Sequence, residues 1–406
     1  MIDGESGDGV FDVAVVGAGI VGATVAYELV RAGASVVVFD PVPGRCSSAG
    51  NAGLVVPSYG VPMSNPAVLL SGLRALLGGD PSVTFARPLT ARTAGWLLRF
   101  ACAARPGRAW RDAGTLCRLA TRSRALYDEF AAVEGVDLGV RNAGFLHLAH
   151  DPAVLRSELR AAKGLADLGV RHDVLDPAAV AALEPCLDVS GIAGAVRFPD
   201  DAALDPERVT AAYTDAAVRH GAELRRHTVI GARMSGGRAE AVRTAAGWVR
   251  ASAFVVATGA ESATAGRMFG VRLPVEPGYG WSLTLPAAGA LPVNALMCAD
   301  DHVVINAGSG RVRLTGGMQF GGRASDPPPP GAVAAMRATA TRVLPALGDI
   351  ADAGTTWRGA RPMTPSGIPM LRRAAGNVVV ATGHGTLGMT LGPVTGRAVA
   401  TLLSQA

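Results

Sequence analysis

Cysteine is scarce in this chain, which has five: Cys46, Cys102, Cys117, Cys186 and Cys298. None belongs to a C-x-x-C pair or lies at ligand spacing from a histidine, so we predict free thiols and no metal site. Long apolar runs are also missing. Because a membrane-spanning helix needs about 20 consecutive apolar residues, we predict no transmembrane segment. The first residues are polar and acidic and do not resemble a secretory signal, so we expect a cytoplasmic protein.

Charged residues are few, at 17% of 406 residues against 49% hydrophobic residues, which is typical of a globular protein of about two to three domains. The net charge of +5 comes from dispersed arginines, with Lys163 as the one lysine. Nucleic-acid binding surfaces gather basic residues in a stripe with interleaved aromatic residues, and no such stripe occurs here. We therefore expect no nucleic-acid partner.

The segment from Phe11 to Asp40 has the order of a β-α-β nucleotide cradle. A short apolar strand is followed by Gly17, Gly19 and Gly22 at G-x-G-x-x-G spacing, and a helix is expected over residues 20–32. These glycines allow a tight turn, a close approach of backbone to pyrophosphate, and close helix packing. Asp40 ends the second strand, where an acid accepts hydrogen bonds from a ribose and disfavours a 2′-phosphate. NAD and FAD both remain open at this point.

A second loop rich in small residues, PVPGRCSSAGNAGLVVPS, follows Asp40 directly. Its small side chains would let a flat ring lie against the backbone, while the serine hydroxyls and the Asn51 amide could form hydrogen bonds. Taken without its context, the stretch also fits an ordinary surface loop.

Two later segments repeat the pattern of a strand that ends in a small turn. An apolar strand over 251–260 ends in Ala257-Thr258-Gly259. A strand over 377–382 is followed by a glycine turn and by a helix over about 390–404. A helix N-terminus favours negative charge, which is the electrostatic requirement of a reduced flavin. The sequence therefore predicts a cofactor site at the carboxyl ends of parallel strands.

The remaining segments suggest a second domain inserted between the parts of the nucleotide fold. The expected helices cover most of 64–135, 152–168, 176–184, the residues after Asp205-Pro206, and 333–344; the expected strands are 143–149, 227–233, 247–250 and several within 271–320. Pro66 to Leu77 fits either an amphipathic membrane-surface helix or a core-facing or dimer helix, and its single basic residue, Arg74, favours the latter. The chain could therefore form a homo-oligomer or associate peripherally with a membrane.

With these residues in place, the chain resembles the D-amino acid oxidase superfamily of flavoproteins, and within it the bacterial D-amino acid dehydrogenase small-subunit and glycine oxidase branch. The resemblance rests on GAGIVG with Asp40, SSAGNAG, WRGARPMTPSGIPM and ATGHGTLGMTLGPVTG, which occur in the family order. It implies an α/β fold with a discontinuous Rossmann-type FAD-binding domain and an inserted substrate domain on a mixed or antiparallel sheet. We assign 1–65, 198–270 and 345–406 to the first domain, and 66–197 and 271–344 to the second.

The resemblance also implies which residues bind non-covalent FAD, since the turn in which some relatives attach the flavin has no cysteine. The residues expected to contact FAD are Gly17, Ala18, Gly19, Ile20, Val21, Gly22, Asp40, Ser47, Ser48, Asn51, Ala52, Gly53, Leu54, Val229, Thr258, Gly259, Gly383, Gly385, Thr386, Leu387, Gly388, Met389 and Thr390.

Four residues are expected at the reaction centre. Arg361, in GARP, matches the family arginine that binds the substrate carboxylate by a bidentate contact. His384 matches the histidine of the glycine turn, where its partner could be the flavin or a backbone carbonyl. Trp281 stands where relatives usually carry a tyrosine, with Tyr279 two residues earlier, and either ring could fix the substrate side chain. Thr386 stands where glycine oxidase relatives carry a second arginine, so with Trp281 the pocket could be unusually apolar and admit a bulky or N-substituted substrate.

The implied reaction is hydride transfer from the α-carbon of an amino acid to flavin N5, followed by hydrolysis of the imine. A primary amine would be deaminated, as in D-amino acid dehydrogenases and oxidases. The alternative is a secondary amine, such as an N-substituted glycine or a cyclic imino acid. Either oxygen or a membrane quinone could reoxidise the flavin. Two alternatives come from other classes. An NAD-dependent dehydrogenase would leave SSAGNAG and the GHGTLG turn unexplained, and Arg361 argues against a non-catalytic flavin-binding subunit.

Overall fold

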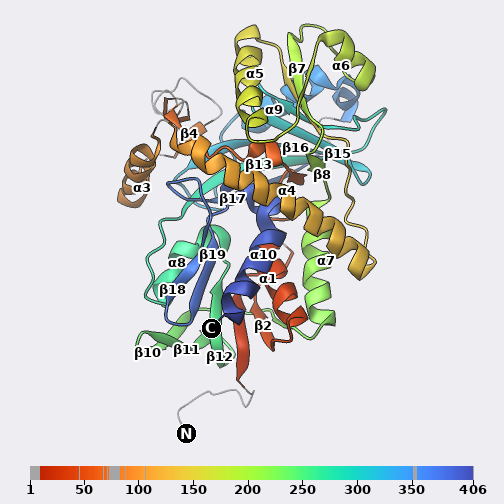
Figure 1. The fold of residues 1–406 in the computed structure, drawn as a ribbon. Helices are drawn as coiled ribbons and strands as arrows, with labels where there is room; N and C mark the ends of the chain where they lie inside the picture. Colours follow the sequence, from red (N-terminus) through yellow and green to blue (C-terminus); the bar gives the residue numbers. More distant parts are fainter. Residues whose placement is uncertain are drawn as a thin grey trace.

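The computed structural model describes residues 10–44, 46–66, 68–70, 72, 83–86, 88–105, 107–350 and 354–405. Most of the helix predicted over Pro66 to Leu77 lies outside these residues. The described strands form an eight-stranded sheet, a nine-stranded sheet and one short strand pair. In Figure 1 the eight-stranded sheet occupies the lower half of the molecule and the nine-stranded sheet the upper half.

The eight-stranded sheet has a parallel centre built from apolar strands. Its strands are β1 (Phe11–Val16), β2 (Val36–Phe39), β9 (Glu223–Arg225), β10 (Gly231–Ser235), β11 (Arg238–Thr244), β12 (Gly247–Val256), β18 (Met370–Ala375) and β19 (Val378–Thr382). β1 pairs in parallel with β2 and β12, and β12 pairs in parallel with β19. Strands such as Val36–Phe39 are buried along their whole length, as expected where layers cover both faces of a sheet.

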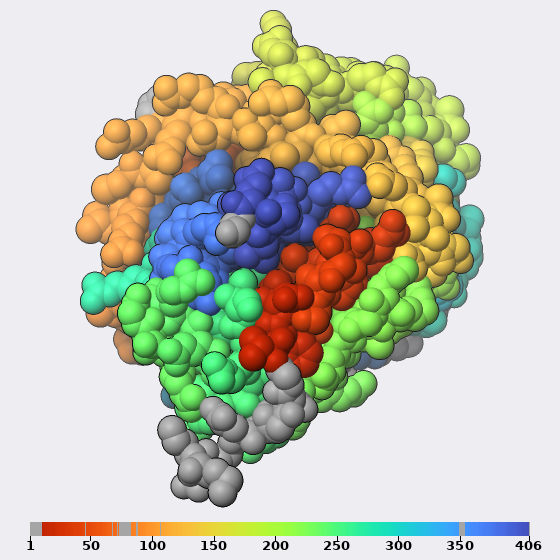
Figure 2. All heavy atoms as spheres, turned by 60° about the horizontal axis from the view of Figure 1, so that its bottom comes forward, coloured from red at the N-terminus to blue at the C-terminus, as the bar shows by residue number. Residues whose placement is uncertain are grey.

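Three helices cover one face of this sheet. They are α1 (Ile20–Arg31), α7 (Pro206–Arg219) and α10 (Gly388–Ser404). Figure 2 shows α1 between α10 and α7, so residues from the two ends of the chain lie side by side. Thr24 of α1 donates a hydrogen bond from its hydroxyl to the Gly392 carbonyl of α10 at 2.9 Å. A further cluster of buried apolar residues lies on the other face, between the sheet and α8 (Ser262–Met268).

The nine-stranded sheet is mixed and follows the order β17-β13-β16-β15-β14-β5-β7-β6, with β4 beside β16. Its strands are β4 (Val83–Phe85), β5 (Phe145–Ala149), β6 (Asp173–Leu175), β7 (Gly194–Phe198), β13 (Glu276–Pro286), β14 (Ala295–Cys298), β15 (Val303–Gly308), β16 (Arg311–Phe320) and β17 (Thr355–Met363). The other helices described are α3 (Ala91–Ala103), α4 (Arg108–Glu134), α5 (Pro152–Ala166), α6 (Pro177–Leu183) and α9 (Ala332–Val343).

Short elements join the two halves. β3 (Leu54–Val55) pairs with β8 (Ala202–Ala203), and the 3-10 helix η1 (Pro57–Tyr59) follows β3. The further 3-10 helices are η2 (Gly259–Glu261), η3 (Pro345–Ile350) and η4 (Gly385–Leu387). The hydroxyl of Tyr127, in α4, donates a 2.5 Å hydrogen bond to the Met389 carbonyl of α10. This hydrogen bond holds α4 against α10, which covers the eight-stranded sheet.

The predicted α/β fold class is confirmed, and the helices expected over 20–32, 152–168, 176–184 and 333–344 are present. Asp205 caps α7 as its sequence predicted, by accepting hydrogen bonds from the Glu207 and Arg208 amides. The strand predicted over 227–233 was misplaced, because β10 begins at Gly231, and β11 was missed. β17 lies inside the range predicted for the FAD-binding domain, yet it pairs with β13 of the nine-stranded sheet. The division into two domains stays a prediction.

Candidate active site

The carboxyl ends of four strands meet at one edge of the eight-stranded sheet. Each of these strands is parallel to a neighbour, so residues distant in sequence reach the same edge. The loops that leave this edge begin at Gly17 after β1, Asp40 after β2, Ala257 after β12 and Gly383 after β19. The structure therefore brings together the four segments that the sequence singled out.

Gly17 and Gly22 are required by close backbone contacts. Gly17 has a φ of +103°, and a Cβ built there would lie 2.6 Å from the Ala257 carbonyl oxygen. A Cβ on Gly22 would lie 1.8 Å from the Gly17 carbonyl oxygen. No side chain larger than hydrogen fits at either position, so the β1 turn packs directly against the turn after β12 and against its own helix.

The first turn of α1 offers backbone donors. Gly19 is the N-cap residue and has no side chain to accept them. The Ile20 amide donates to the Ser48 hydroxyl at 3.0 Å, while Val21 and Gly22 lie within the turn whose amides have no helical acceptor. The Asp40 carboxylate accepts the Ala18 amide at 2.8 Å, so its position beside this turn is fixed. Such a helix start can hold a pyrophosphate, and this geometry fits a dinucleotide.

The predicted ring-binding loop lies against the same helix start, and its polar groups make hydrogen bonds both within the loop and to other segments. The Asn51 side chain donates to the Ser48 carbonyl and accepts from the Gly53 amide, both at 2.6 Å. The Ser47 hydroxyl accepts the Ala360 amide of β17 at 3.2 Å. Ser48 and Asn51 thus have protein partners, and the loop presents small residues and backbone to its surroundings.

The turn after β12 and the turn after β19 are joined by hydroxyl groups. Thr258 donates to the Ser262 hydroxyl at 3.2 Å, and Ser262 lies 2.6 Å from the Thr382 hydroxyl. Thr382 also donates to the Gly259 carbonyl at 3.1 Å. Val229, predicted near the cofactor, is buried in the apolar cluster on the α8 side of the sheet.

The C-terminal glycine turn contains a buried neutral histidine. His384 is 4% exposed, and burial lowers its pKa to about 4, so it is uncharged at neutral pH. Its Nε2 lies 3.0 Å from the Thr395 hydroxyl, a partner that the sequence analysis did not consider. Gly383 has a φ of +80°, and a Cβ there would meet the Thr364 side chain at 2.4 Å.

The same turn reaches the ring-binding loop through Thr390. Its hydroxyl donates to the Leu54 carbonyl at 3.2 Å and accepts the Val56 amide at 3.2 Å. The intervening residues form η4 and the first turn of α10, and they include Thr386, Leu387, Gly388 and Met389. The helix start of α10 therefore lies beside β3, where it could place its amides against a flavin.

Arg361, on β17, has an unusual environment for an arginine. Its guanidinium lies over Gly280, where a Cβ would be 2.2 Å from Nη1, and Nη1 donates to the Gly317 carbonyl at 2.8 Å. No carboxylate among the described residues lies within 4 Å of it. Burial lowers the pKa of this guanidinium to about 10, so it stays protonated at neutral pH. The arrangement supplies a positive charge with donors available to an anion.

Tyr59 of η1, which the sequence analysis missed, is close enough to interact electrostatically with Arg361. The charge of Arg361 opposes the burial that raises the pKa of Tyr59, and the phenol remains neutral. Its ring packs against Phe145 and His147, with ring centroids 6.1 Å away in both cases. The one signal in the sequence was an aromatic residue between proline and glycine, shortly after the glycine-rich loop.

The two aromatic candidates on β13 have different surroundings. Trp281 is 4% exposed and its ring covers Gly317, where a Cβ would lie 2.1 Å from the indole. Tyr279 lies below the guanidinium of Arg358, which is 4.5 Å from the centre of its ring. Trp281 therefore shapes the backbone whose carbonyl binds Arg361. Contact of either ring with substrate stays a prediction.

Within the described part of the chain, no group of three or more His, Cys, Asp or Glu side chains could hold a metal ion. None of the helices in that part is long and apolar enough to cross a membrane. The five cysteines are free thiols.

A family model described as FAD dependent oxidoreductase, DAO, matches residues 12–402. The D-amino acid dehydrogenase of Methylobacterium sp. (strain 4-46) is 35% identical over 406 residues, covering 97% of this chain and 95% of the relative. Glycine oxidase from Bacillus cereus ATCC 14579 has a TM-score of 0.76 at 22% identity, covering 97% of this chain and 95% of that chain. L-proline dehydrogenase from P. horikoshii has a TM-score of 0.76 at 21% identity, covering 98% and 94%. The two solved structures share the fold.

Proposed function

The chain belongs to the DAO family of FAD-dependent oxidoreductases, and from this premise we propose that it oxidises the amine of an amino acid, as a D-amino acid dehydrogenase or oxidase does. The observation that carries the proposal is Arg361, a protonated arginine with no carboxylate partner among the described residues. A substrate carboxylate would supply the missing negative charge and accept two parallel hydrogen bonds from the guanidinium.

The cradle fits FAD. The α1 amides beside Gly19 would hold the pyrophosphate, Asp40 the ribose, and the small residues of loop 47–54 together with the glycine turn after β19 the flavin ring. When bound, the flavin supplies the two-electron acceptor for the hydride that leaves the substrate α-carbon. The protein then has to bind and orient the amino acid, because the cofactor carries the redox chemistry.

The residues around Arg361 can do this. Arg361 would fix the carboxylate, and the neutral phenol of Tyr59 could donate a further hydrogen bond. The Met318 sulfur lies 3.9 Å from the Arg361 guanidinium, and Met363 contacts the neighbouring glycine positions, so this side of the site is apolar. An apolar neighbourhood favours an uncharged substrate side chain.

The alternative substrate is an N-substituted glycine or a cyclic imino acid. The carboxylate anchor would serve it equally, and the apolar methionines beside Arg361 would accept an N-substituent or a ring. Proteins of the same fold include glycine oxidase and L-proline dehydrogenase. In either case the oxidised C=N product is hydrolysed by water.

We further infer a cytoplasmic enzyme whose reduced flavin is reoxidised by oxygen or by a membrane quinone.

The test is anaerobic bleaching of the flavin absorbance by D-amino acids, glycine, N-alkylglycines and cyclic imino acids. We expect D-amino acids with uncharged side chains to bleach the wild-type protein. Arg361→Ala should raise the substrate concentration for half-maximal bleaching roughly 100-fold, because a charge-assisted contact is lost. Arg372→Ala, an exposed arginine of β18, is the control. Bleaching by secondary amines alone would select the alternative, and no bleaching by any of them would refute amine oxidation.

A further inference from the structure

In the loop predicted to hold the flavin ring, the carbonyls of Ala49, Asn51 and Ala52 accept no backbone amide of the described residues. Buried carbonyls need hydrogen-bond donors, and a loop of small residues has few of its own. Here the donors come from side chains of the nine-stranded sheet. They bind the carbonyls of Ala49, Asn51 and Ala52, and one of them also approaches the Gly53 carbonyl, which accepts the Leu204 amide at 2.8 Å.

Arg313 of β16 supplies the first set of contacts. It is 7% exposed, and its Nη1 donates to the Ala49 carbonyl at 2.7 Å and to the Asn51 carbonyl at 3.3 Å. Its Nη2 donates to Glu207 of α7 at 2.7 Å, and its Nε donates to the Thr284 hydroxyl at 3.2 Å. The ion pair and the hydroxyl aim the guanidinium, so Nη1 is directed at the loop.

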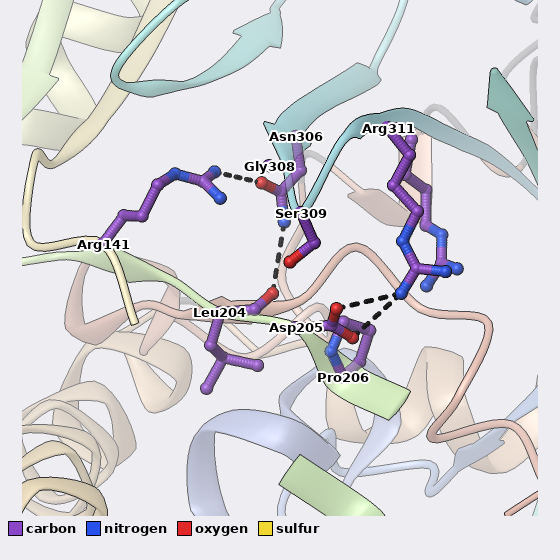
Figure 3. A pocket seen from close by; sticks show the side chains of 9 residues that line it. Arg141, Leu204, Asp205, Pro206, Asn306, Gly308, Ser309 and Arg311 are labelled. Carbon is purple, nitrogen blue, oxygen red and sulfur yellow. Dashed lines mark hydrogen bonds and ion pairs between the residues drawn. The ribbon is translucent and has the colours of Figure 1, made fainter. Parts of the chain in front are cut away.

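Asn306 of β15 supplies the second set. Its Nδ2 donates to the Ala52 carbonyl at 2.6 Å, with the Gly53 carbonyl at 3.4 Å and the Leu204 carbonyl at 3.5 Å. Its Oδ1 accepts Nη2 of Arg141 at 2.5 Å. Figure 3 shows Arg141 reaching Asn306 from one side, with Leu204 on the other. Because Arg141 can only donate, it orients the amide so that the NH₂ group points to the loop.

The strands that bind this loop also position the carboxylate anchor. β16, which carries Arg313, provides the Gly317 carbonyl that accepts Arg361. β17, which carries Arg361, donates the Ala360 amide to Ser47. The Trp357 ring of β17 also lies against Gly50, where a Cβ would be 2.3 Å from the indole. The positions of loop 47–54 and of the Arg361 guanidinium are therefore both set by β16 and β17.

We propose that Arg313 and Asn306 are positioning residues for the flavin. They hold the backbone of residues 49–53 in the conformation that receives the ring, and they tie the position of the ring to that of Arg361. The inference rests on the proposed assignment of loop 47–54 to the flavin. Under this inference the affinity for FAD depends on Arg313 and Asn306, although neither side chain has to contact the cofactor.

Two arginines of β16 form a matched pair for the test. Arg311 and Arg313 both pair with Glu207, but Arg311 otherwise binds Asp205 and Arg313 binds the loop carbonyls. We would compare R311Q and R313Q, with N306D as an independent variant that keeps the acceptor for Arg141 and loses the donors to the loop. The readouts are the FAD dissociation constant of the apoprotein, from flavin fluorescence, and the visible circular dichroism of the bound flavin.

We expect R313Q and N306D to weaken FAD binding at least tenfold and to change the visible dichroism, whereas R311Q stays within twofold of wild type. Arg313→Lys should recover part of the affinity, because an ammonium can donate to the same carbonyls. If R313Q does not fold, N306D decides by the same criterion. Affinities and dichroism of both variants equal to those of R311Q would overturn the inference. None of these measurements uses a substrate, so their outcome is separate from that of the bleaching screen.

Discussion

Arg361 and Tyr59 lie near each other although they come from distant parts of the sequence. Arg361 comes from an edge strand of the nine-stranded sheet, and Tyr59 from the 3-10 helix that follows β3. The neighbours of Tyr59 restrict its position. The Ser58 amide donates to Asp201 at 3.2 Å, and a Cβ on Gly60 would lie 2.4 Å from the Cys117 sulfur. A neutral phenol held near an unpaired guanidinium is suited to share a carboxylate with it.

We expect Tyr59→Phe to raise the KM for the amino acid substrate roughly 10-fold with little change in kcat. A hydrogen bond to a charged group contributes about 1.5–3 kcal/mol, and this one would form with the substrate carboxylate before and during the reaction. Steady-state kinetics with the substrate identified by bleaching would measure the effect.

Tyr213→Phe is the matched control, because Tyr213 is buried among helices of the eight-stranded sheet and stacks on Phe130 with ring centroids 3.7 Å apart. Its kinetics should equal those of wild type. An unchanged KM in Tyr59→Phe would contradict a contact between the phenol and the carboxylate.

At the scale of elements, α1 and α10 pack more closely than side chains of ordinary size would permit. A Cβ on Gly396 of α10 would lie 2.6 Å from the Thr24 carbonyl oxygen of α1, and one on Gly392 would meet Ile20 at 2.8 Å. This contact joins the first helix of the chain to the last, and both begin at the cofactor edge of the sheet. Small residues on α10 therefore set how near the two helix starts lie.

Gly396→Ala should lower the free energy of unfolding by about 1–3 kcal/mol, because the added methyl group meets backbone that cannot move aside. Gly95→Ala in α3 is the opposite case, since its Cβ position has no atom of the described residues within 4 Å beyond its chain neighbours and its own helix backbone. There alanine should stabilise by up to about 1 kcal/mol through helix propensity. Urea denaturation of both variants would measure the difference, and equal effects would refute the packing argument.

At the scale of the whole molecule, the candidate cofactor site is assembled from segments spread over nearly the entire chain. The turns at Gly17, Asp40, Ala257 and Gly383 meet at one edge, and the nine-stranded sheet fixes the loop between them. A ligand bound there contacts parts of the chain that are far apart in the unfolded state. Its binding free energy is therefore added to the stability of the folded protein.

Removal of FAD should lower the thermal midpoint, and its return should restore it. At a free concentration of about 100 times its dissociation constant, FAD contributes about 2.7 kcal/mol, which corresponds to a shift of a few degrees. Thermal unfolding of the apoprotein at increasing FAD concentration would show this shift. Riboflavin, which lacks the phosphates and adenosine that the α1 turn would bind, should give a smaller one. A midpoint independent of FAD would contradict the proposed cradle.

Local patterns in the chain were enough to predict the nucleotide cradle, the α/β class and most helices, because each depends on neighbouring residues. The positive φ of Gly17 belongs to the turn itself, Gly22 faces the carbonyl of Gly17, and the Asp205 cap depends on the amides that follow it. The same patterns, with the family resemblance, pointed to Arg361, whose contact with substrate stays a prediction.

Only the folded chain decided the contacts that depend on distant pairing. Nothing local indicates that β17 pairs with β13 of the nine-stranded sheet, or that Tyr59 lies near Arg361. The hydrogen bonds from Arg313 and Asn306 to loop carbonyls span more than 250 residues, and the loop sequence carries no sign of its donors. Register and side-chain direction across the two sheets set these contacts, and both arise when the sheets assemble.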